Sequence, residues 1–343
     1  MLILDSCGRA WFRQQAEFPM VHLVELRRIS LIFFASIALW SVQNASAQQR
    51  RLGSRPTDRI TLAQDLAYAD TANPRQELDL LLPTSRTGSQ PLPVIVYIHG
   101  GAWQAGNRAG GRGRLLRYVE TGHYAGVSVG YRLTGESIWP SQIHDCKAAI
   151  RWIRDHADQY DLDPNRIGVI GSSAGGHLAA MLGTSGGVMP LEGDLGDHDD
   201  VSSQVQCVVT EFGPSDLLSM KDYPSRLDHD GPSSPEGKLV GGRVSDNVDI
   251  ARAASPITYV TSDDPPFLII HGNRDVVVPY NQSERLATAL QQVDVECTFV
   301  TVDGAGHGRF RNPEVENREQ QFFDKHLRDR PSTVSASTIQ SGR

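Results

Sequence analysis

Gly171-Ser172-Ser173-Ala174-Gly175 stands between an apolar run of strand type, Arg166–Ile170, and a helix-forming segment that ends near Leu182. A strand, a Gly-x-Ser-x-Gly turn and a helix, in this order, form the layout of a nucleophile elbow. The turn is so sharp that its central residue takes a strained backbone conformation, and the neighbouring positions must be nearly free of side chains. The two outer glycines meet that requirement, so Ser173 is the predicted nucleophile.

Apolar segments alternate with helical ones along most of the chain. Strand-like runs cover 76–82, 93–99, 124–131, 166–170, 205–210, 266–270 and 295–302, and helical patterns cover 140–157, 174–182, 280–292 and 313–328. Nearly continuous apolar runs are typical of strands buried on both faces. Repeated strand-then-helix units predict an α/β fold with a mainly parallel sheet and helices on both faces. Ligand sites in such sheets lie at the carboxyl ends of the strands.

A serine hydroxyl needs a base, usually histidine, and a carboxylate that orients the imidazole. In this kind of fold the three follow in the order serine, acid, histidine. His307 lies in a glycine-rich loop directly after one predicted strand, and Asp275 closes a turn directly after another. Ser173, Asp275 and His307 are therefore the predicted catalytic residues. Asp303 is the alternative acid, although it is close to His307 along the chain.

Acyl transfer also requires donors for the negative charge that develops on the carbonyl oxygen, each worth roughly 3–4 kcal/mol. Ala174, the residue after the serine, is one predicted donor, because its N–H opens a helix. Gly101 and Ala102 are the others, within His99-Gly-Gly-Ala-Trp103. Trp103 either lines the acyl pocket or packs the loop, and the histidine that begins the segment is expected to brace it.

Four motifs in this order resemble those of the α/β-hydrolase superfamily: His-Gly-Gly-Ala-Trp at 99–103, Gly-Ser-Ser-Ala-Gly at 171–175, His-Gly-Asn-Arg-Asp at 271–275 and Gly-His at 306–307. The chain looks most similar to hormone-sensitive-lipase-like carboxylesterases, and among them to the bacterial feruloyl- and acetylxylan-esterase-like group. The resemblance covers about residues 67–327 and implies hydrolysis of carboxylic esters without a cofactor, in some members on plant polysaccharides. It also implies a structural role for His177. Ala102 departs from the third glycine that is usual in the lipase-like branch.

Two segments of the chain lack the regular pattern. Residues 221–246 are rich in proline, glycine, serine and aspartate, which predicts a small irregular insertion over the site. Residues 329–343 are rich in serine and threonine and are predicted to be disordered. The hydrolase domain itself is expected to span 58–328.

The N-terminal residues 1–47 have the pattern of a secretory signal peptide. Two arginines precede the apolar run Ile29–Trp40, and an Ala-x-Ala site follows, so cleavage is expected before Gln48. The run is shorter than the roughly 20 residues of a membrane span, and a retained anchor is the alternative. Translation is expected to start near Met20, with a flexible leader at 48–57. A secreted or periplasmic location follows from this pattern.

Composition and charge argue against several other classes of protein. The net charge is -7 and basic residues cluster only at 108–114, so no nucleic-acid partner is expected. No Gly-Lys-Ser/Thr segment is present, which argues against nucleotide binding. The cysteines form neither a disulfide framework nor a zinc spacing. The acidic segment 192–200 indicates a solvated loop, with a calcium site as the alternative.

The sequence therefore predicts a serine hydrolase that forms an acyl-enzyme. We expect short acyl or aryl esters as substrates, on small molecules or polysaccharides, with no cofactor, no metal and no stable membrane span. The alternative is an amidase or peptidase-like hydrolase, such as an arylformamidase or a relative of prolyl oligopeptidase. The latter class normally adds an N-terminal propeller, for which this chain has too few ordered residues. A binding-only protein is disfavoured because all three catalytic residue types are present.

Overall fold

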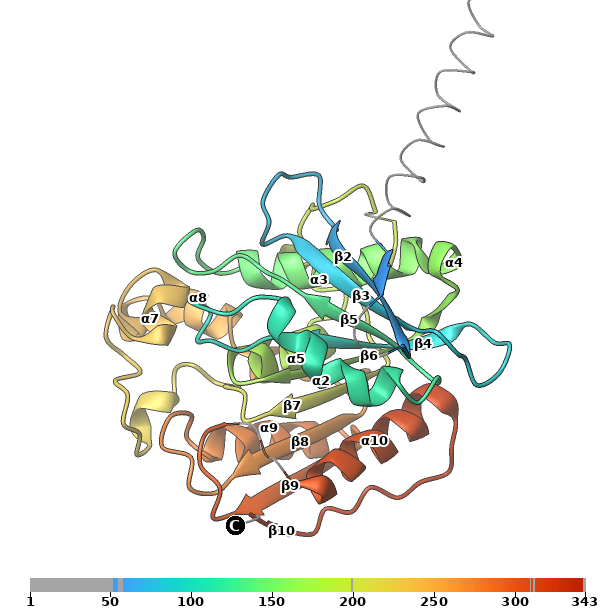
Figure 1. The fold of residues 1–343 in the computed structure, drawn as a ribbon. Helices are drawn as coiled ribbons and strands as arrows, with labels where there is room; N and C mark the ends of the chain where they lie inside the picture. The colour runs from blue at the N-terminus through green and yellow to red at the C-terminus, as the bar shows by residue number, and fades with distance from the viewer. Residues whose placement is uncertain (1–51, 55–57, 199, 309, 311, 342–343) are drawn as a thin grey trace, which may run out of the picture. The chain divides into compact units, whose positions relative to one another are not determined.

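A ten-stranded sheet runs through the described residues in the order β1-β2-β3-β5-β4-β6-β7-β8-β9-β10 (Figure 1). The computed structural model describes residues 52–54, 58–198, 200–308, 310 and 312–341. The predicted signal peptide and the predicted start near Met20 lie outside these residues. Among the described residues, no helix combines the length and the apolar character that a bilayer crossing demands.

Strands β3 to β9 agree with the predicted apolar runs, whereas β1, β2 and β10 were not predicted. The strands are β1 (Leu52–Ser54), β2 (Ile60–Ala67), β3 (Glu77–Pro83), β4 (Leu92–Ile98), β5 (Ala125–Val129), β6 (Leu162–Ser172), β7 (Cys207–Glu211), β8 (Phe267–Gly272), β9 (Cys297–Asp303) and β10 (Ile339–Gln340). From β5 to β10 along the sheet every neighbouring pair is parallel, and β1, β2 and β3 add antiparallel pairings at one edge. The prediction of a mainly parallel sheet is confirmed.

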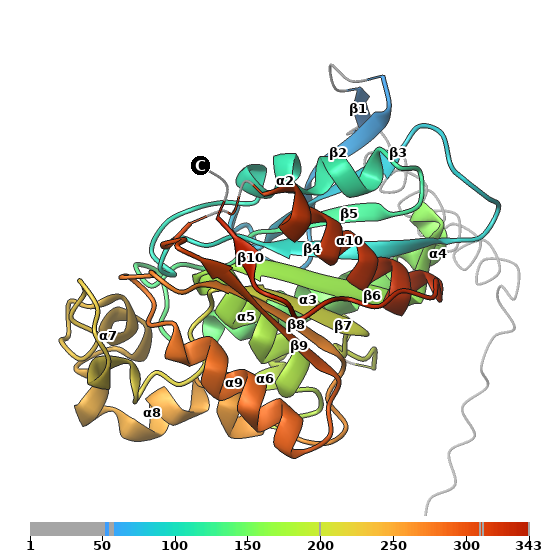
Figure 2. The same cartoon turned by 90° about the horizontal axis from the view of Figure 1, so that it is seen from below.

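Helices cover both faces of this sheet (Figure 2). On one face lie α2 (Ala109–Val119) and α10 (Pro313–Arg328), and on the other lie α3 (Ser141–Asp155), α5 (Ala174–Thr184) and α9 (Asn281–Gln292). Each layer has its own apolar core, with Leu115 and Phe322 in the first and Ile143, Leu178 and Leu286 in the second. The short helices α4 (Ala157–Tyr160) and α6 (Met189–Glu192) follow α3 and α5 in the chain. The arrangement is the α/β-hydrolase fold that the motifs imply.

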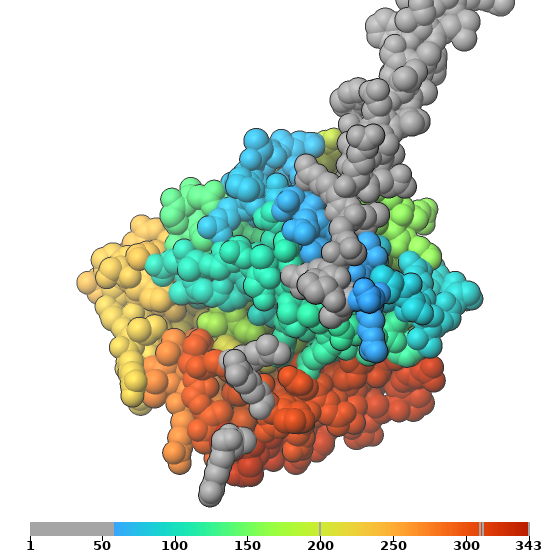
Figure 3. Space-filling model, in the orientation of Figure 1, coloured from blue at the N-terminus to red at the C-terminus, as the bar shows by residue number. Residues whose placement is uncertain are grey.

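The insertion between β7 and β8 is more regular than its composition suggests. It contains η1 (Met220–Asp222), α7 (Pro235–Val240), η2 (Val244–Asp246), α8 (Val248–Ala253) and η3 (Pro256–Tyr259). The prediction of an irregular segment at 221–246 is therefore wrong for α7. Ser234 caps that helix by accepting the N–H of Gly237 at 2.8 Å, and Gly241 ends it at φ 85°. The insertion gathers in one patch of the surface, yellow to orange in Figure 3.

Both ends of the described chain add strands where the sequence predicts irregular structure. Within the predicted flexible leader, Leu52–Ser54 pairs antiparallel with β2. Within the predicted disordered tail, Ile339–Gln340 pairs with β9 and the side chain of Ile339 is buried. Both predictions are wrong at these positions. A sheet edge offers unpaired backbone groups to any nearby segment, whatever its composition.

Candidate active site

Ser173 stands on a turn that only its glycine neighbours permit. It follows β6, precedes α5 and has φ 57° and ψ -123°. A Cβ atom at Gly171 would lie 2.1 Å from the carbonyl oxygen of Gly175, and one at Gly175 would lie 2.1 Å from that of Ile98. The strain is held by hydrogen bonds, because the N–H of Ser173 donates to the carbonyl oxygen of Glu211 at 2.9 Å. The structure thus contains the elbow that the sequence predicts.

The imidazole of His307 lies between the other two predicted catalytic side chains. Its Nε2 is 3.1 Å from Ser173 Oγ, and its Nδ1 is 2.7 Å from Asp275 Oδ2. A carboxylate only accepts, so Nδ1 carries the proton and Nε2 is free to accept the hydroxyl proton. The three residues follow β6, β8 and β9, whose carboxyl ends meet at one edge of the sheet. The structure brings all three together.

The carboxylate of Asp275 is held by four donors. Its Oδ1 accepts the N–H groups of Val277 at 2.8 Å and Val278 at 3.0 Å, and its Oδ2 accepts from His271 at 3.1 Å as well as from His307. Burial by itself raises the pKa of Asp275, but the hydrogen bonds from the two histidines outweigh burial and hold the pKa well below its ordinary value. Asp275 is therefore a permanent anion beside the imidazole.

The predicted oxyanion loop lies directly against the elbow. A Cβ atom at Gly100 would lie 2.7 Å from the carbonyl oxygen of Ser172. Gly101 and Ala102 both have positive φ, 119° and 54°, so the backbone turns sharply at this point. Ala174 is the first residue of α5, and its N–H has no partner within the helix. All three predicted oxyanion residues therefore lie in segments that border Ser173.

Trp103 packs the loop instead of lining a pocket. Its side chain is only 1% exposed, and its Nε1 donates to Nδ1 of His177 at 3.2 Å. The assignment of Trp103 to substrate binding is therefore wrong for this structure. Burial lowers the pKa of His177 to about 4, so the ring is neutral and donates through Nε2 to the carbonyl oxygen of Ala254 at 2.6 Å. His177 joins the oxyanion loop, α5 and the insertion, which is the structural role expected of it.

Comparison with known proteins places this geometry in a family. The BD-FAE family model matches residues 78–290. The chain belongs to the BD-FAE family. A second model, of TAP-like proteins, matches residues 247–334. This BD-FAE chain is 33% identical to the solved structure of a truncated carbohydrate esterase from gut microbiota, with a TM-score of 0.74, covering 80% of this chain and 99% of that one.

Two further relatives agree with this assignment. A bifunctional GH43-CE protein of Bacteroides eggerthii is 35% identical, with a TM-score of 0.71, over 78% of this chain and 35% of its own. Esterase LipC of Mycobacterium tuberculosis is 34% identical over 70% of this chain and 58% of its own. The chain spans about half the length of the curated relatives it matches.

Two residues of this site were not predicted from the sequence. His271 is fully buried and bridges Asp275 to Ser283, whose Oγ is 2.7 Å from its Nδ1. The ring of Phe212 meets the edge of His307 at a centroid distance of 4.8 Å. His271 begins the His-Gly-Asn-Arg-Asp motif, so the sequence pointed to this residue but did not indicate that it would bind Asp275. No motif in the sequence around Phe212 predicted a role in the site, because its contact with His307 depends on where the loop after β9 lies.

A buried charge network lies beneath the elbow. Glu211 accepts the hydroxyl of Ser172 at 2.5 Å, and its other oxygen accepts from Arg114 at 2.8 Å. Arg114 also donates to Glu319 at 2.6 Å, which pairs in turn with Arg117. Two guanidinium groups thus balance two carboxylates, as buried ions require.

A cavity of about 320 Å³ opens beside Ser173 and His307. Tyr97, Phe212 and Arg114 form part of its wall. Gly110 and Gly113 of α2 also line it, and a Cβ atom at either position would meet nothing within 4 Å. Apart from Arg114, the α2 residues that line the cavity are glycines, and the space beside the serine is open to a substrate.

The alternative catalytic acid from the sequence is not realised. Asp303 Oδ1 accepts from Nδ2 of Asn273 at 2.7 Å and does not contact His307. Among the described residues, the acidic groups of 192–200 form no cluster of three possible metal ligands by themselves; only His198 of that segment joins such a group, with residues outside it.

Proposed function

We propose that this BD-FAE chain is a serine esterase that hydrolyses carboxylic esters through an acyl-enzyme. One observation carries the proposal: the imidazole of His307 is hydrogen bonded to Ser173 on one side and to the anionic Asp275 on the other. This is the arrangement that turns a hydroxyl into a nucleophile. The esterases among the relatives add support from outside the chain.

The chemistry follows from the proton positions. Ser173 Oγ attacks the ester carbonyl carbon while its proton passes to His307 Nε2, and Asp275 stabilises the imidazolium that forms. The N–H groups of Ala174, Gly101 and Ala102 are the proposed donors to the carbonyl oxygen as it gains charge. His307 then gives its proton to the alcohol oxygen as the C–O bond breaks. Water, deprotonated by the same imidazole, then attacks the acyl carbon; the bond to Ser173 Oγ breaks as the imidazolium returns the proton to that oxygen, and the carboxylic acid leaves.

We further propose short acyl or aryl esters, including esters on carbohydrate, as the substrate class. The cavity of about 320 Å³ beside Ser173 has room for such groups, and open space lies in front of Gly110 and Gly113 of α2. The solved relative from gut microbiota, a carbohydrate esterase by name, supports the same substrate class.

The test is turnover of p-nitrophenyl acetate, p-nitrophenyl butyrate and acetylated xylan, with acetanilide as the amide counterpart. We expect hydrolysis of the esters, and loss of that activity in Ser173→Ala with the unfolding temperature unchanged. Undiminished turnover in Ser173→Ala would remove this serine from the mechanism. Faster cleavage of the anilide than of the esters would favour the amidase alternative.

We also propose that the protein is exported and cleaved before Gln48, on the sequence pattern alone. N-terminal sequencing of protein recovered from the periplasm or the medium is expected to begin at Gln48. A sequence that begins well before this residue would contradict the proposal.

A further inference from the structure

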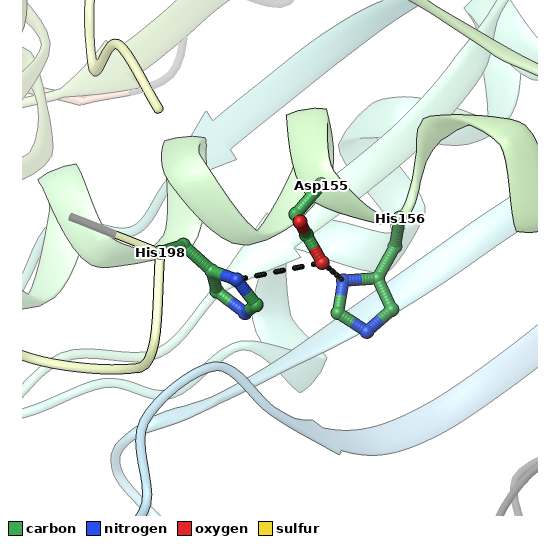
Figure 4. Close-up of side chains that lie close together, drawn as sticks. All are labelled: Asp155, His156 and His198. Carbon is green, nitrogen blue, oxygen red and sulfur yellow. Dashed lines mark ion pairs between the residues drawn. The ribbon is translucent and has the colours of Figure 1, made fainter. Parts of the chain in front are cut away.

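Three possible metal ligands meet on the layer of α3, outside the active site. Asp155 is the last residue of α3, His156 follows it, and His198 comes from the loop between α6 and β7. Figure 4 shows the carboxylate of Asp155 directed between the two imidazole rings. The possible ligand atoms of the three side chains all lie within 4.8 Å of one another.

The distances match the spacing of metal ligands better than that of hydrogen bonds. Asp155 Oδ2 is 3.4 Å from Nδ1 of His156 and 3.4 Å from Nδ1 of His198. A normal N–H···O bond joins atoms about 2.7–3.2 Å apart. Zinc holds nitrogen and carboxylate oxygen at about 2.0–2.2 Å in a tetrahedron, which places two ligand atoms about 3.3–3.5 Å apart.

The segments that carry the ligands are fixed without a metal. Arg151 of α3 donates to the carbonyl oxygens of Glu192 at 3.0 Å and Leu195 at 3.2 Å, on the His198 side. Arg154 donates to carbonyl oxygens on the other side of His198 in the same loop. A site that is already assembled loses little chain entropy when an ion binds.

The rings are fixed as well. His156 stacks on Trp152 with centroids 4.1 Å apart, and His198 meets His156 at 5.6 Å and 90°. His156 Nδ1 also donates to the carbonyl oxygen of Trp152 at 3.0 Å. A metal ion at Nδ1 would replace that proton and would lie close to the same carbonyl oxygen, which is then a further possible ligand. The carbonyl keeps a partner, because it also accepts the backbone N–H of His156 at 3.0 Å.

We propose that Asp155, His156 and His198 form a zinc site that fastens the loop before β7 to the end of α3. Two imidazoles and one carboxylate suit zinc, whereas calcium takes oxygen ligands only. The fourth ligand would be the carbonyl oxygen of Trp152 or a solvent molecule, which the 44% exposure of the carboxylate admits. The sequence gives no zinc spacing for this set because His198 is far from the other two along the chain.

The site is independent of ester hydrolysis. Ser173 follows the carboxyl end of β6, whereas α3 ends just before α4 and the amino end of the same strand. The two sites therefore lie at opposite ends of β6. The proposed function and the zinc site can fail separately.

Calorimetric titration of tag-free, chelator-treated protein with Zn²⁺ tests the proposal. We expect one zinc per chain, a higher unfolding temperature with zinc, and no comparable effect of Ca²⁺. In His198→Asn the affinity should fall by at least about 100-fold, the upper end of the loss from removing an outer partner of a metal ligand. Asp155→Asn should weaken binding too. Co²⁺ should give the visible absorption of a four-coordinate site in the wild type alone.

His123→Asn is the matched control, since His123 is also a half-buried histidine and has no place in the cluster. It should bind zinc as the wild type does, and ester turnover should be unchanged in all three variants. Binding of equal strength in His198→Asn would mean adventitious metal only and would overturn the proposal. Absence of a one-to-one zinc complex in the wild type would overturn it as well.

Discussion

Among the described residues, two groups of serine, histidine and carboxylate that share no residue have nearly the same geometry, and only one has the setting of an active site. The first contains Ser173, His307 and Asp275, and the second contains Ser225, His229 and Glu236 of the insertion. In the second, His229 Nε2 is 2.9 Å from the serine Oγ and Nδ1 is 3.0 Å from Glu236 Oε2. The distances nearly equal those of the first group, 3.1 Å and 2.7 Å.

The surroundings of the two serines differ. Ser225 Oγ is 3.1 Å from the carbonyl oxygens of both Val276 and Val277 and accepts the N–H of Leu227 at 3.1 Å. The side chain of His229 is 1% exposed, whereas that of His307 is 21% exposed and borders the cavity. The second group ties the insertion to the loop that follows Asp275. Access and a strained turn, more than residue types, distinguish the two groups.

Covalent labelling should give the largest difference between them. An alkyl phosphonate with a good leaving group is expected to label Ser173 alone, as located by mass spectrometry of peptides. Ser173→Ala should lower kcat by about a million-fold, as for the serine of other working triads. Ser225→Ala should keep kcat within about threefold of wild type, because a truncated hydroxyl there leaves the catalytic atoms in place. Labelling of Ser225 would break the comparison.

The acids should differ next. Asp275→Asn is expected to lower kcat by about ten-thousand-fold, because an amide favours the wrong imidazole tautomer. Glu236→Gln, the matched change in the second group, should leave kcat nearly unchanged. Steady-state kinetics on p-nitrophenyl acetate measures both. Equal losses in the two variants would show that the insertion network is part of catalysis.

For the histidines the order should reverse: replacing His229 should reduce the stability of the fold more than replacing His307. His229→Ala leaves the buried Glu236 without its partner and should lower the free energy of unfolding by about 3 kcal/mol. His307→Ala should cost much less, since its ring is partly exposed. Urea unfolding followed by fluorescence gives both values. A smaller loss in His229→Ala than in His307→Ala would contradict the structural role of the second group.

The smallest effect is expected in the pH dependence. The imidazole can act as a base only in its neutral form, so kcat/KM should fall toward acid pH. Asp275 should not add to this slope, because its pKa is held below the ordinary value of about 3.9. Its stabilising effect is complete above about pH 3.9 and is lost only as the pH falls through the lower folded-state pKa. A slope of two above pH 4 would contradict this, and His229→Gln should leave the profile unchanged.

Much of the site could be predicted because its residues obey local rules. The elbow needs small neighbours for Ser173, and Asp275 and His307 each follow a buried strand in a turn. Helix α10 was predicted at its observed bounds, Pro313–Arg328, where Asn312 accepts the N–H of Glu314 at 2.9 Å and a proline follows it. Such signals act between residues near each other in the chain, so a single sequence contains them.

Helix α2 shows where local rules fail. Its glycines argue against a helix, and none was predicted at 109–119. A Cβ atom at Gly111 would lie 2.2 Å from Ser128 Oγ and 2.4 Å from the ring of Tyr97, so the glycine lets α2 approach β4 and β5 closely. A glycine is therefore required at this position by side chains of β4 and β5, which are distant from α2 in the sequence.

The amino-acid sequence alone determined strands β3 to β9, the helices α3, α5, α9 and α10, the serine at the elbow and the identity of its acid and base, because sterics and hydrophobic runs act locally. Only the tertiary structure decided that Trp103 is buried, that Leu52–Ser54 and Ile339–Gln340 join the sheet, and that His198 meets Asp155. Those outcomes depend on contacts between segments far apart in the chain, and the residues themselves do not specify which distant partner they will find.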